Sequence, residues 1–316
     1  MLEAAAKTPH LGGTPLQFGM DGFGVWAEFT LSTQYGSAAQ RLRWIEPGTF
    51  LMGSPEDEAE RESNEGPRHR VTLTQGFWLA DSACTQALWQ AVMGNNPSYF
   101  KDNEYNPVEQ VSWHDVQPFL RKLEELLPGC KAGLPTEAEW EYACRAGTGT
   151  PFSFGLQITP GQVNYDGSHP YAGGEKGLCR EKTVPVKSLP PNGWGLYEMH
   201  GNVWEWCADG LRDYDGQPQQ YPAGPPGGGN TPPAVRGGSW YLIAWRVRSA
   251  SRFAPRPGLA DLSRGFRLCL RSIEPGQVPA PPGGRGREPA PPRDEAGAAS
   301  AKRSFLPKWL RFSRKK

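Results

Sequence analysis

The sequence predicts a domain of mixed strands and helices joined by long irregular connections. Segments near the N-terminus alternate apolar and polar residues, which is typical of strands with one buried face. Three later segments begin at helix-capping residues and then carry apolar residues that a helix would bury. The chain holds 39 Gly and 32 Pro among 316 residues, well above ordinary usage. Part of this excess lies in the loops and part in the C-terminal tail.

Strand-like alternation is clearest over residues 25–31 and 41–45. Turn-forming residues at 34–37 lie between them, so a hairpin is predicted. The acidic run over 56–65 is expected to be a solvated loop. Further strands are predicted at 70–74, 76–79, 184–186 and 203–206, and a long surface loop at 215–233.

Three helices are predicted from their end signals. Thr85 can cap a helix that ends at Gly94. Ser112 opens a capping box before a helix that Gly129 ends, and apolar residues in this helix recur at three- and four-residue spacing. Thr136 can cap the third helix. These caps place the helices firmly along the chain.

Two short motifs enclose the segment expected to be functional. Residues 235–240 read VRGGSW and residues 265–268 read GFRL. Residues 241–264 between them contain no Cys, no His and one acidic residue, Asp261. Paired glycines at 237 and 238 favour a tight turn that lets backbone approach closely. The segment therefore lacks the side chains that most catalytic sites use.

Five motifs in order, with the enclosing pair counted as one, carry a resemblance to a known family. Besides the enclosing pair, they are residues 44–54, 107–113, 134–143 and 195–206. Together they resemble the formylglycine-generating enzyme (sulfatase-modifying factor) family over residues 40–270. The resemblance implies a C-type-lectin-like α+β fold, a single domain with much irregular structure.

The domain boundaries follow from this resemblance and from composition. We expect a flexible N-terminus at 1–21, the lectin-type domain at 22–272 and a disordered Pro/Gly-rich linker at 273–300. Residues 301–316 form a basic tail with apolar residues among its Lys and Arg. Such a tail suits contact with an anionic surface, or it is simply a solubilising charged end.

The resemblance also implies chemistry that this chain lacks. The family's two copper-binding cysteines fall on Leu242 and Val247, and neither side chain can bind Cu(I), which needs sulfur. The five histidines are scattered, with no pair at the helical spacing of a metal site. We therefore expect no copper and no iron. The six cysteines form no Cys-x-x-Cys pair and are expected to be reduced, mostly buried thiols. His200 is expected to be a hydrogen-bonded structural residue.

Calcium is a separate expectation. The resemblance implies a structural Ca²⁺ loop with ligands at Glu198, Gly201, Val203 and Glu205, with Glu198 where the enzyme has an amide. Two carboxylates and two backbone carbonyls suit a hard, oxygen-seeking ion. A second family site maps only in part, onto Asn164 and Tyr165. The alternative for Glu205 is a buried acid paired with Arg236 or Arg267.

The segment 241–264 is predicted to be a recognition surface. Aromatic and Arg side chains are favoured at protein interfaces, and three consecutive large residues at 241–243 cannot all face one core in an extended chain. Arg248, Ser249, Ala250 and Arg252 match the family scaffold instead. The predicted contact residues are Tyr241, Leu242, Ile243, Trp245, Arg246, Phe253, Arg256, Leu259, Leu262 and Arg264.

This arrangement resembles the variable proteins of diversity-generating retroelements, which diversify the same segment of a lectin-like fold. The sequence therefore predicts a non-catalytic protein that binds a protein ligand. The alternative is an oxidoreductase-like or accessory family member with its own activity. A near-copy of the DNA for 236–268 beside a reverse transcriptase gene, differing at adenines, would distinguish a diversified surface from a fixed one.

Charge and hydropathy narrow the remaining partners. The net charge is +1 and the pI is about 7.6, which gives no electrostatic argument for nucleic acid. No apolar run reaches 18 residues, so no transmembrane helix is predicted. The N-terminus does not resemble a secretory signal, and the cytoplasm is the expected location.

Overall fold

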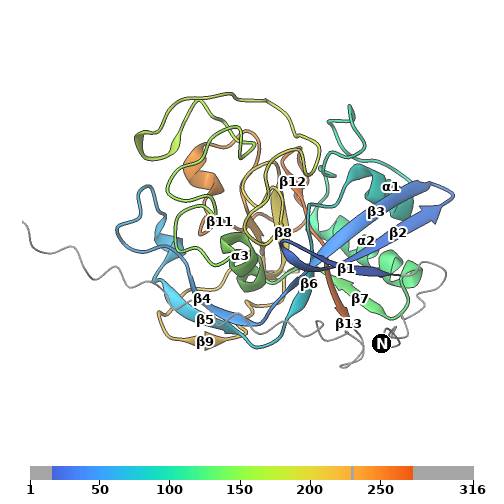
Figure 1. Ribbon diagram of the computed structural model, residues 1–316, viewed down its shortest axis with the longest axis horizontal. Helices are drawn as coiled ribbons and strands as arrows, with labels where there is room; N and C mark the ends of the chain where they lie inside the picture. Colours follow the sequence, from blue (N-terminus) through green and yellow to red (C-terminus); the bar gives the residue numbers. More distant parts are fainter. Residues whose placement is uncertain (1–15, 229–230, 273–316) are drawn as a thin grey trace, which may run out of the picture. The chain divides into compact units, whose positions relative to one another are not determined.

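The computed structural model describes residues 16–228 and 231–272. Its largest sheet has six antiparallel strands, and Figure 1 shows their course. The predicted hairpin is present as its second and third strands, which pair from Trp26↔Arg43 to Thr33↔Gly36. In spatial order the strands are β1 (Gln17–Asp21), β2 (Gly24–Thr33), β3 (Gly36–Ile45), β6 (Phe77–Ala80), β13 (Cys269–Ser272) and β7 (Cys130–Gly133).

Both faces of this sheet are covered. Side chains alternate along β6, so Trp78 packs in one cluster with α1 (Gln86–Met93) and α2 (Trp113–Leu126). Leu79 packs in the other cluster with α3 (Glu137–Arg145). The two hydrophobic clusters therefore share the central strands.

Two smaller sheets and long loops complete the domain, in agreement with the predicted α+β class. The four-stranded sheet has the order β11 (Arg252–Phe253), β10 (Pro233–Arg236), β8 (Trp204–Gly210) and β12 (Arg264–Gly265). The three-stranded sheet joins β4 (Gly48–Met52), β5 (His69–Leu73) and β9 (Gln219–Gln220). A third apolar cluster lies among loops and includes the short helices η2 (Tyr171–Gly173) and η3 (Ala244–Val247).

The helix caps agree with the sequence. The Thr85 hydroxyl accepts a hydrogen bond from Leu88 N at 3.1 Å, and Gly94 ends α1 in the left-handed conformation with φ of 81°. Capping boxes begin α2 at Ser112 and α3 at Thr136. α2 ends at Leu126, before Gly129. Local signals therefore located all three helices.

The predicted N-terminal boundary at residue 22 is too late. Residues 17–21 form β1, which pairs with β2 from Gln17↔Glu28 to Asp21↔Gly24. Residues 1–15, the linker at 273–300 and the tail at 301–316 lie outside the described residues. No helix within the described ranges is long and apolar enough to cross a membrane.

The predicted strand at 184–186 is absent. Val184 N donates to the side chain of Asn202 at 3.0 Å, and Val186 N donates to Tyr105 O at 2.9 Å. Pro185 between them has no N–H to offer a ladder. The backbone groups of this segment are thus satisfied one at a time by unrelated neighbours.

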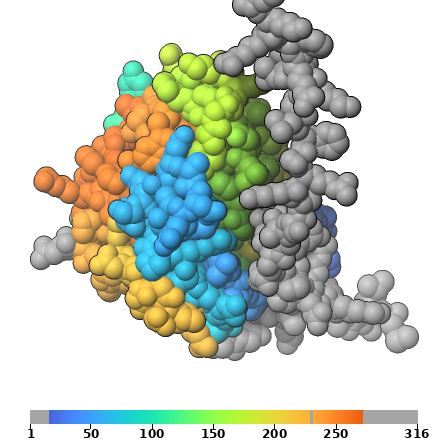
Figure 2. Space-filling view, turned by 90° about the vertical axis from the view of Figure 1, so that its left-hand side faces the viewer, coloured from blue at the N-terminus to red at the C-terminus, as the bar shows by residue number. Residues whose placement is uncertain are grey.

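The acidic run at 56–65 is an exposed loop at most of its positions, as predicted, but two of its acids turn inward. Glu65, at the end of η1 (Ser63–Glu65), is fully buried and contacts Arg248 at 2.6 Å, and the nearly buried Glu58 contacts the same arginine at 2.5 Å. We call residues 55–65 the acidic strap. Figure 2 shows this part of the chain, in blue, lying against the orange segment that contains η3. Sequence alone could not supply the distant arginine that draws these acids inward.

Candidate functional site

The segment 241–264 begins at the expected tight turn. Gly237 and Gly238 have φ of 93° and 74°, in the left-handed region that glycine favours. A Cβ added to Gly238 would lie 2.4 Å from Val247 Cγ1 and 2.8 Å from Arg246 O. η3 thus packs directly against the turn, at a separation that only glycine permits.

The structure exposes part of the predicted recognition surface. The exposed fractions of Tyr241 and Phe253 are 45% and 44%, and Arg256 and Leu259 are exposed as well. The other predicted contact residues before Ser263 are half-buried: Leu242, Ile243, Trp245, Arg246 and Leu262. At least one of the three large residues at 241–243 therefore faces solvent, as predicted.

Arg264 was expected at the rim of this surface, and that expectation is wrong. Its exposed fraction is 6%, its guanidinium pairs with Asp261, and its backbone pairs with Trp204 in the parallel β12–β8 contact. The strand pairing turns this residue into the domain. Arg264 is therefore a buried residue that supports the recognition segment from below.

Arg246 links the recognition segment to the acidic strap. Its guanidinium lies 4.1 Å from the centre of the Trp245 ring and contacts Glu62 at 2.6 Å. Both members of the ion pair are about 30% exposed, so the pair contributes roughly 0–1 kcal/mol to stability. Its effect is to hold Arg246 in one orientation.

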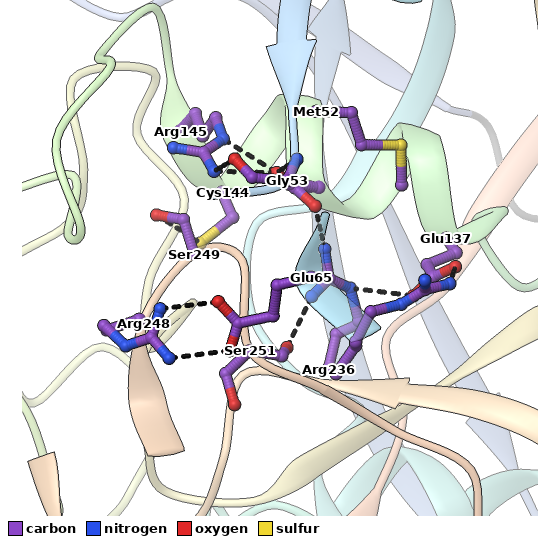
Figure 3. Close-up of polar contacts among 12 residues, drawn as sticks. Met52, Gly53, Glu65, Glu137, Cys144, Arg145, Arg236, Arg248, Ser249 and Ser251 are labelled. Carbon is purple, nitrogen blue, oxygen red and sulfur yellow. Dashed lines mark hydrogen bonds and ion pairs between the residues drawn. The ribbon is translucent and has the colours of Figure 1, made fainter. Parts of the chain in front are cut away.

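Below the surface lies a buried network of arginines and glutamates. Arg248 binds both carboxylate oxygens of Glu65, at 2.6 and 2.7 Å. Arg236 pairs with Glu141, and Arg252 pairs with Glu137. Figure 3 shows Arg248 facing Glu65, with Arg236 and Glu137 in the same layer. Because each buried charge has a partner, the network fixes the backbone that carries the surface.

The positions expected to hold copper-binding cysteines are apolar and packed. Val247 is fully buried in the loop cluster, and Leu242 is half-buried. The carbonyl of Val247 accepts a hydrogen bond from His200 Nδ1 at 2.7 Å. Ser153 N donates to the other ring nitrogen at 3.0 Å, and burial lowers the pKa of His200 to about 4. His200 is thus the hydrogen-bonded structural residue that was predicted.

The buried thiol nearest to this site is chemically quiet. Cys144 Sγ lies 3.8 Å from Ser249 Oγ, and burial raises the pKa of the thiol to about 12. A thiolate is the form that binds metals and attacks electrophiles, and burial holds this cysteine in the thiol form at neutral pH. Cys84, Cys207 and Cys269 are buried free thiols as well, as predicted.

The two carboxylates of the predicted calcium loop have protein partners. Glu205 receives Arg267 Nε at 2.6 Å, Arg267 Nη2 at 2.7 Å and Trp140 Nε1 at 2.6 Å. Glu198 accepts from Lys187 N at 3.1 Å, and burial raises its pKa to about 7. The Arg267 pair is one of the two alternatives predicted for Glu205. Calcium binding by Glu198, Gly201, Val203 and Glu205 stays a prediction.

Sequence reasoning missed two groups that support the surface. One is the acidic strap, whose glutamates pair with Arg246 and Arg248. The other is the pair Tyr99 and Phe100 in the loop after α1: the Phe100 ring contacts Trp240, and the Tyr99 ring contacts Phe100. The number of acids in the strap was a usable signal, because buried arginines require partners. The aromatic pair gave no signal, since spatial neighbours far apart in sequence leave no local pattern.

Comparison with known proteins identifies the family. Residues 29–272 match the sulfatase-modifying factor enzyme 1-like domain. The chain belongs to this family.

The relatives of this chain include formylglycine-generating enzymes and a variable protein. The formylglycine-generating enzyme of Streptomyces coelicolor is 33% identical over 230 residues, covering 67% of this chain and 70% of that enzyme. The mouse formylglycine-generating enzyme is 32% identical over 211 residues, covering 64% of this chain and 53% of that enzyme. The solved structure of Treponema denticola variable protein 1 is 27% identical, with a TM-score of 0.63, covering 77% of this chain and 99% of that one. Both predicted resemblances are thus confirmed.

Proposed function

We propose that this member of the family is a binding protein without the oxidase chemistry of formylglycine generation. The replacement of both copper-ligand positions by Leu242 and Val247 carries the proposal. Cu(I) sites need soft sulfur or imidazole ligands, and the imidazole of His200 is already committed to Val247 O and Ser153 N. The packed side chain of Val247 fills the place of the second ligand.

The exposed part of 241–264 is proposed to bind a protein ligand. Tyr241, Phe253 and Leu259 are exposed apolar groups, and Arg256 is an exposed cation beside them in sequence. Buried aromatic anchors ringed by polar groups contribute most of the binding free energy at protein interfaces. Similarity to a variable protein supports this reading, and diversification of the segment stays part of the proposal. The proposed calcium ion has a structural role.

The binding proposal can be tested with peptides selected from a displayed random library on the wild-type protein. We expect the Trp245→Ala/Phe253→Ala variant to bind them at least tenfold more weakly, a loss of about 1.4 kcal/mol or more, while remaining folded. Phe253→Ala alone covers the case in which loss of Trp245 unfolds the domain. The control is Met20→Ala/Tyr35→Ala, which removes two exposed apolar side chains elsewhere. Unchanged affinity in the folded test variants would overturn the assignment.

The absence of oxidase chemistry needs its own measurement. Purified protein should be analysed for bound metals, then supplied with copper and a thiol peptide in air. We expect no bound copper and no aldehyde in the peptide. Stoichiometric copper, or formylglycine in the product, would overturn the proposal in favour of an active oxidoreductase-like member of the family.

A further inference from the structure

Arg246 presents one unused edge of its guanidinium to solvent. Its Nη1 donates to the Glu62 carboxylate at 2.6 Å. Neither Nε nor Nη2 has an acceptor in the described part of the chain, and neither is among the buried nitrogens that lack one. Both atoms therefore meet water, in agreement with the 30% exposure of this side chain. The Nε–Nη2 edge is thus available to a molecule outside the domain.

The guanidinium is already held in place by the domain itself. It lies 4.1 Å from the centre of the Trp245 ring, and the Glu62 carboxylate fixes it from the acidic strap. The backbone is fixed as well, because Arg246 N donates to Ile243 O at 3.0 Å and Arg246 O lies against Gly238. A preorganised group loses little conformational entropy on binding. The free edge therefore has a defined position on the recognition segment.

A carboxylate is the group that this edge fits. The N–H bonds of Nε and Nη2 are parallel, so they match the two oxygens of a carboxylate. The same chain already contains an arginine that binds two acids, because Arg248 contacts Glu58 at 2.5 Å and Glu65 at 2.6 Å. One acid on the guanidinium of Arg246 therefore leaves room for a second, which the ligand would supply.

The other charges of the acidic strap do not attract anions in general. Glu56, Asp57 and Glu60 are exposed acids, and the cation among them, Arg61, donates its Nε–H to the Ser54 hydroxyl at 3.0 Å. A long-range field from the strap therefore opposes the approach of a carboxylate. Selective binding has to come from the paired hydrogen bonds of the free edge, which the single ammonium of a lysine cannot supply.

We propose that the Nε–Nη2 edge of Arg246 binds a carboxylate of the protein ligand. This carboxylate belongs to an Asp or Glu side chain or to the C-terminus of the ligand. The inference rests on the proposed binding function and assigns the chemistry that one of its contact residues recognises. Arg246 is then a specificity-determining residue, and Glu62 is the positioning residue that orients it.

The probes are N-acetylaspartic acid α-amide and N-acetylalanine, which carry a side-chain and a C-terminal carboxylate respectively. N-acetylasparagine amide is the uncharged comparison. Titration of isotope-labelled protein at constant ionic strength follows the arginine Nε–H resonances by NMR, and Arg246→Lys identifies the Arg246 signal by its loss. We expect a carboxylate probe to shift this signal saturably, and the uncharged probe to shift it at least about threefold less. The carboxylate probe that gives the larger shift identifies the source.

Arg41 is the matched internal control. Its side chain is 31% exposed, lies 4.3 Å from the centre of the Trp26 ring and pairs with Glu28, but it does so through Nε at 2.9 Å. The Nε–H resonance of Arg41 should stay in place, because the corresponding edge is occupied. Probe binding measured by saturation-transfer NMR should fall about threefold or more in Arg246→Lys, which keeps the charge and loses the paired donors. It should stay unchanged in Arg41→Lys.

The outcomes separate this inference from the proposed function. If neither carboxylate moves the Arg246 signal, if the uncharged probe moves it equally, or if Arg246→Lys keeps full probe binding, the free edge is not a carboxylate site. The binding function still stands in that case when Phe253→Ala weakens the library-selected peptides. If the Arg246 signal moves as expected while Phe253→Ala leaves peptide affinity unchanged, the carboxylate contact stands and the exposed anchors assigned to 241–264 are wrong.

Discussion

At the scale of single residues, Glu198 has the environment with the clearest consequence. Its carboxyl is buried, and one of its oxygens has no hydrogen-bond partner among the described residues. Burial raises its pKa from 4.5 to about 7. Between these two values the unfolded chain releases the proton while the folded chain keeps it. The contribution of Glu198 to the free energy of unfolding therefore falls as the pH rises from about 4.5 to 7, and stays level above that range.

Replacing Glu198 by Gln should remove this pH dependence. Relative to wild type, E198Q should gain up to roughly 3 kcal/mol of stability between pH 4.5 and pH 8, because each pKa unit corresponds to about 1.4 kcal/mol. Urea unfolding of both proteins at pH 4.5, 6 and 8 measures the effect. Glu125→Gln, on the exposed side of α2, is the control. A wild-type-to-variant difference that is the same at all three pH values would contradict the assignment.

Residue-scale chemistry was predictable where the decisive neighbour lies close in sequence. The helix caps at Thr85, Ser112 and Thr136 depend on atoms three residues away, and all three are confirmed. The inward turn of Arg264 depends on β12 pairing with β8, and the ring contact of Phe100 depends on Trp240. Such partners are chosen by the tertiary fold, so a reading of local pattern could not find them.

At the scale of elements, the acidic strap differs from its prediction because two of its acids are buried against Arg248. Its glutamates bind Arg248 from 183 and 190 positions away. Tyr171 adds a hydrogen bond from its hydroxyl to Ala59 O at 2.7 Å. The strap is therefore fixed by long-range contacts and has little regular structure of its own. Its order should depend on Arg248.

The variant Arg248→Ala should loosen the strap and destabilise the domain by about 3–5 kcal/mol, because it strands buried Glu65 without a partner. Urea unfolding reports the stability, and hydrogen exchange reports faster opening of residues 55–65. The comparison variant is Arg41→Ala, which breaks the half-exposed pair with Glu28 and should cost about 1 kcal/mol or less. Equal losses in the two variants would show that burial of the Arg248 pair contributes nothing.

At the scale of the whole molecule, the six-stranded sheet joins two hydrophobic clusters into one cooperative unit. Leu79 and Trp78, adjacent on β6, enter different clusters, and Cys269 and Leu270 do the same on β13. Neither cluster can lose its packing while these strands stay in place. The described domain should therefore unfold in a single step.

The variant Phe119→Ala tests this coupling from one side of the sheet. Phe119 is fully buried and stacks on Trp89 at 5.1 Å, so we expect a loss of about 3–5 kcal/mol. Tryptophan fluorescence and far-ultraviolet circular dichroism should agree with each other on the unfolding midpoint, both in the wild-type protein and in the variant. Leu156→Ala, at an exposed position, should alter stability by about 0.5 kcal/mol or less. Separate midpoints for the two signals in Phe119→Ala would show that the clusters unfold independently.

The fold class was predictable because ordered motifs carried the family resemblance and local patterns located most of the elements. The candidate surface was predictable in outline for the same reason. Which side chains of this surface are buried was not predictable, because the burial of Arg264 and the contacts of Arg246 depend on segments that lie far away in the sequence.

The buried arginine–glutamate layer has a consequence for how this protein can change. Arg236, Arg248 and Arg252 keep their charges below the surface, paired with buried acids. Tyr241, Phe253 and Leu259 meet solvent. A substitution at an outer position removes few interior contacts, whereas one in the ionic layer leaves a stranded charge. Tolerance to mutation therefore differs between neighbouring positions of this segment. Exposed positions can accept new side chains while the buried ion pairs below them stay intact.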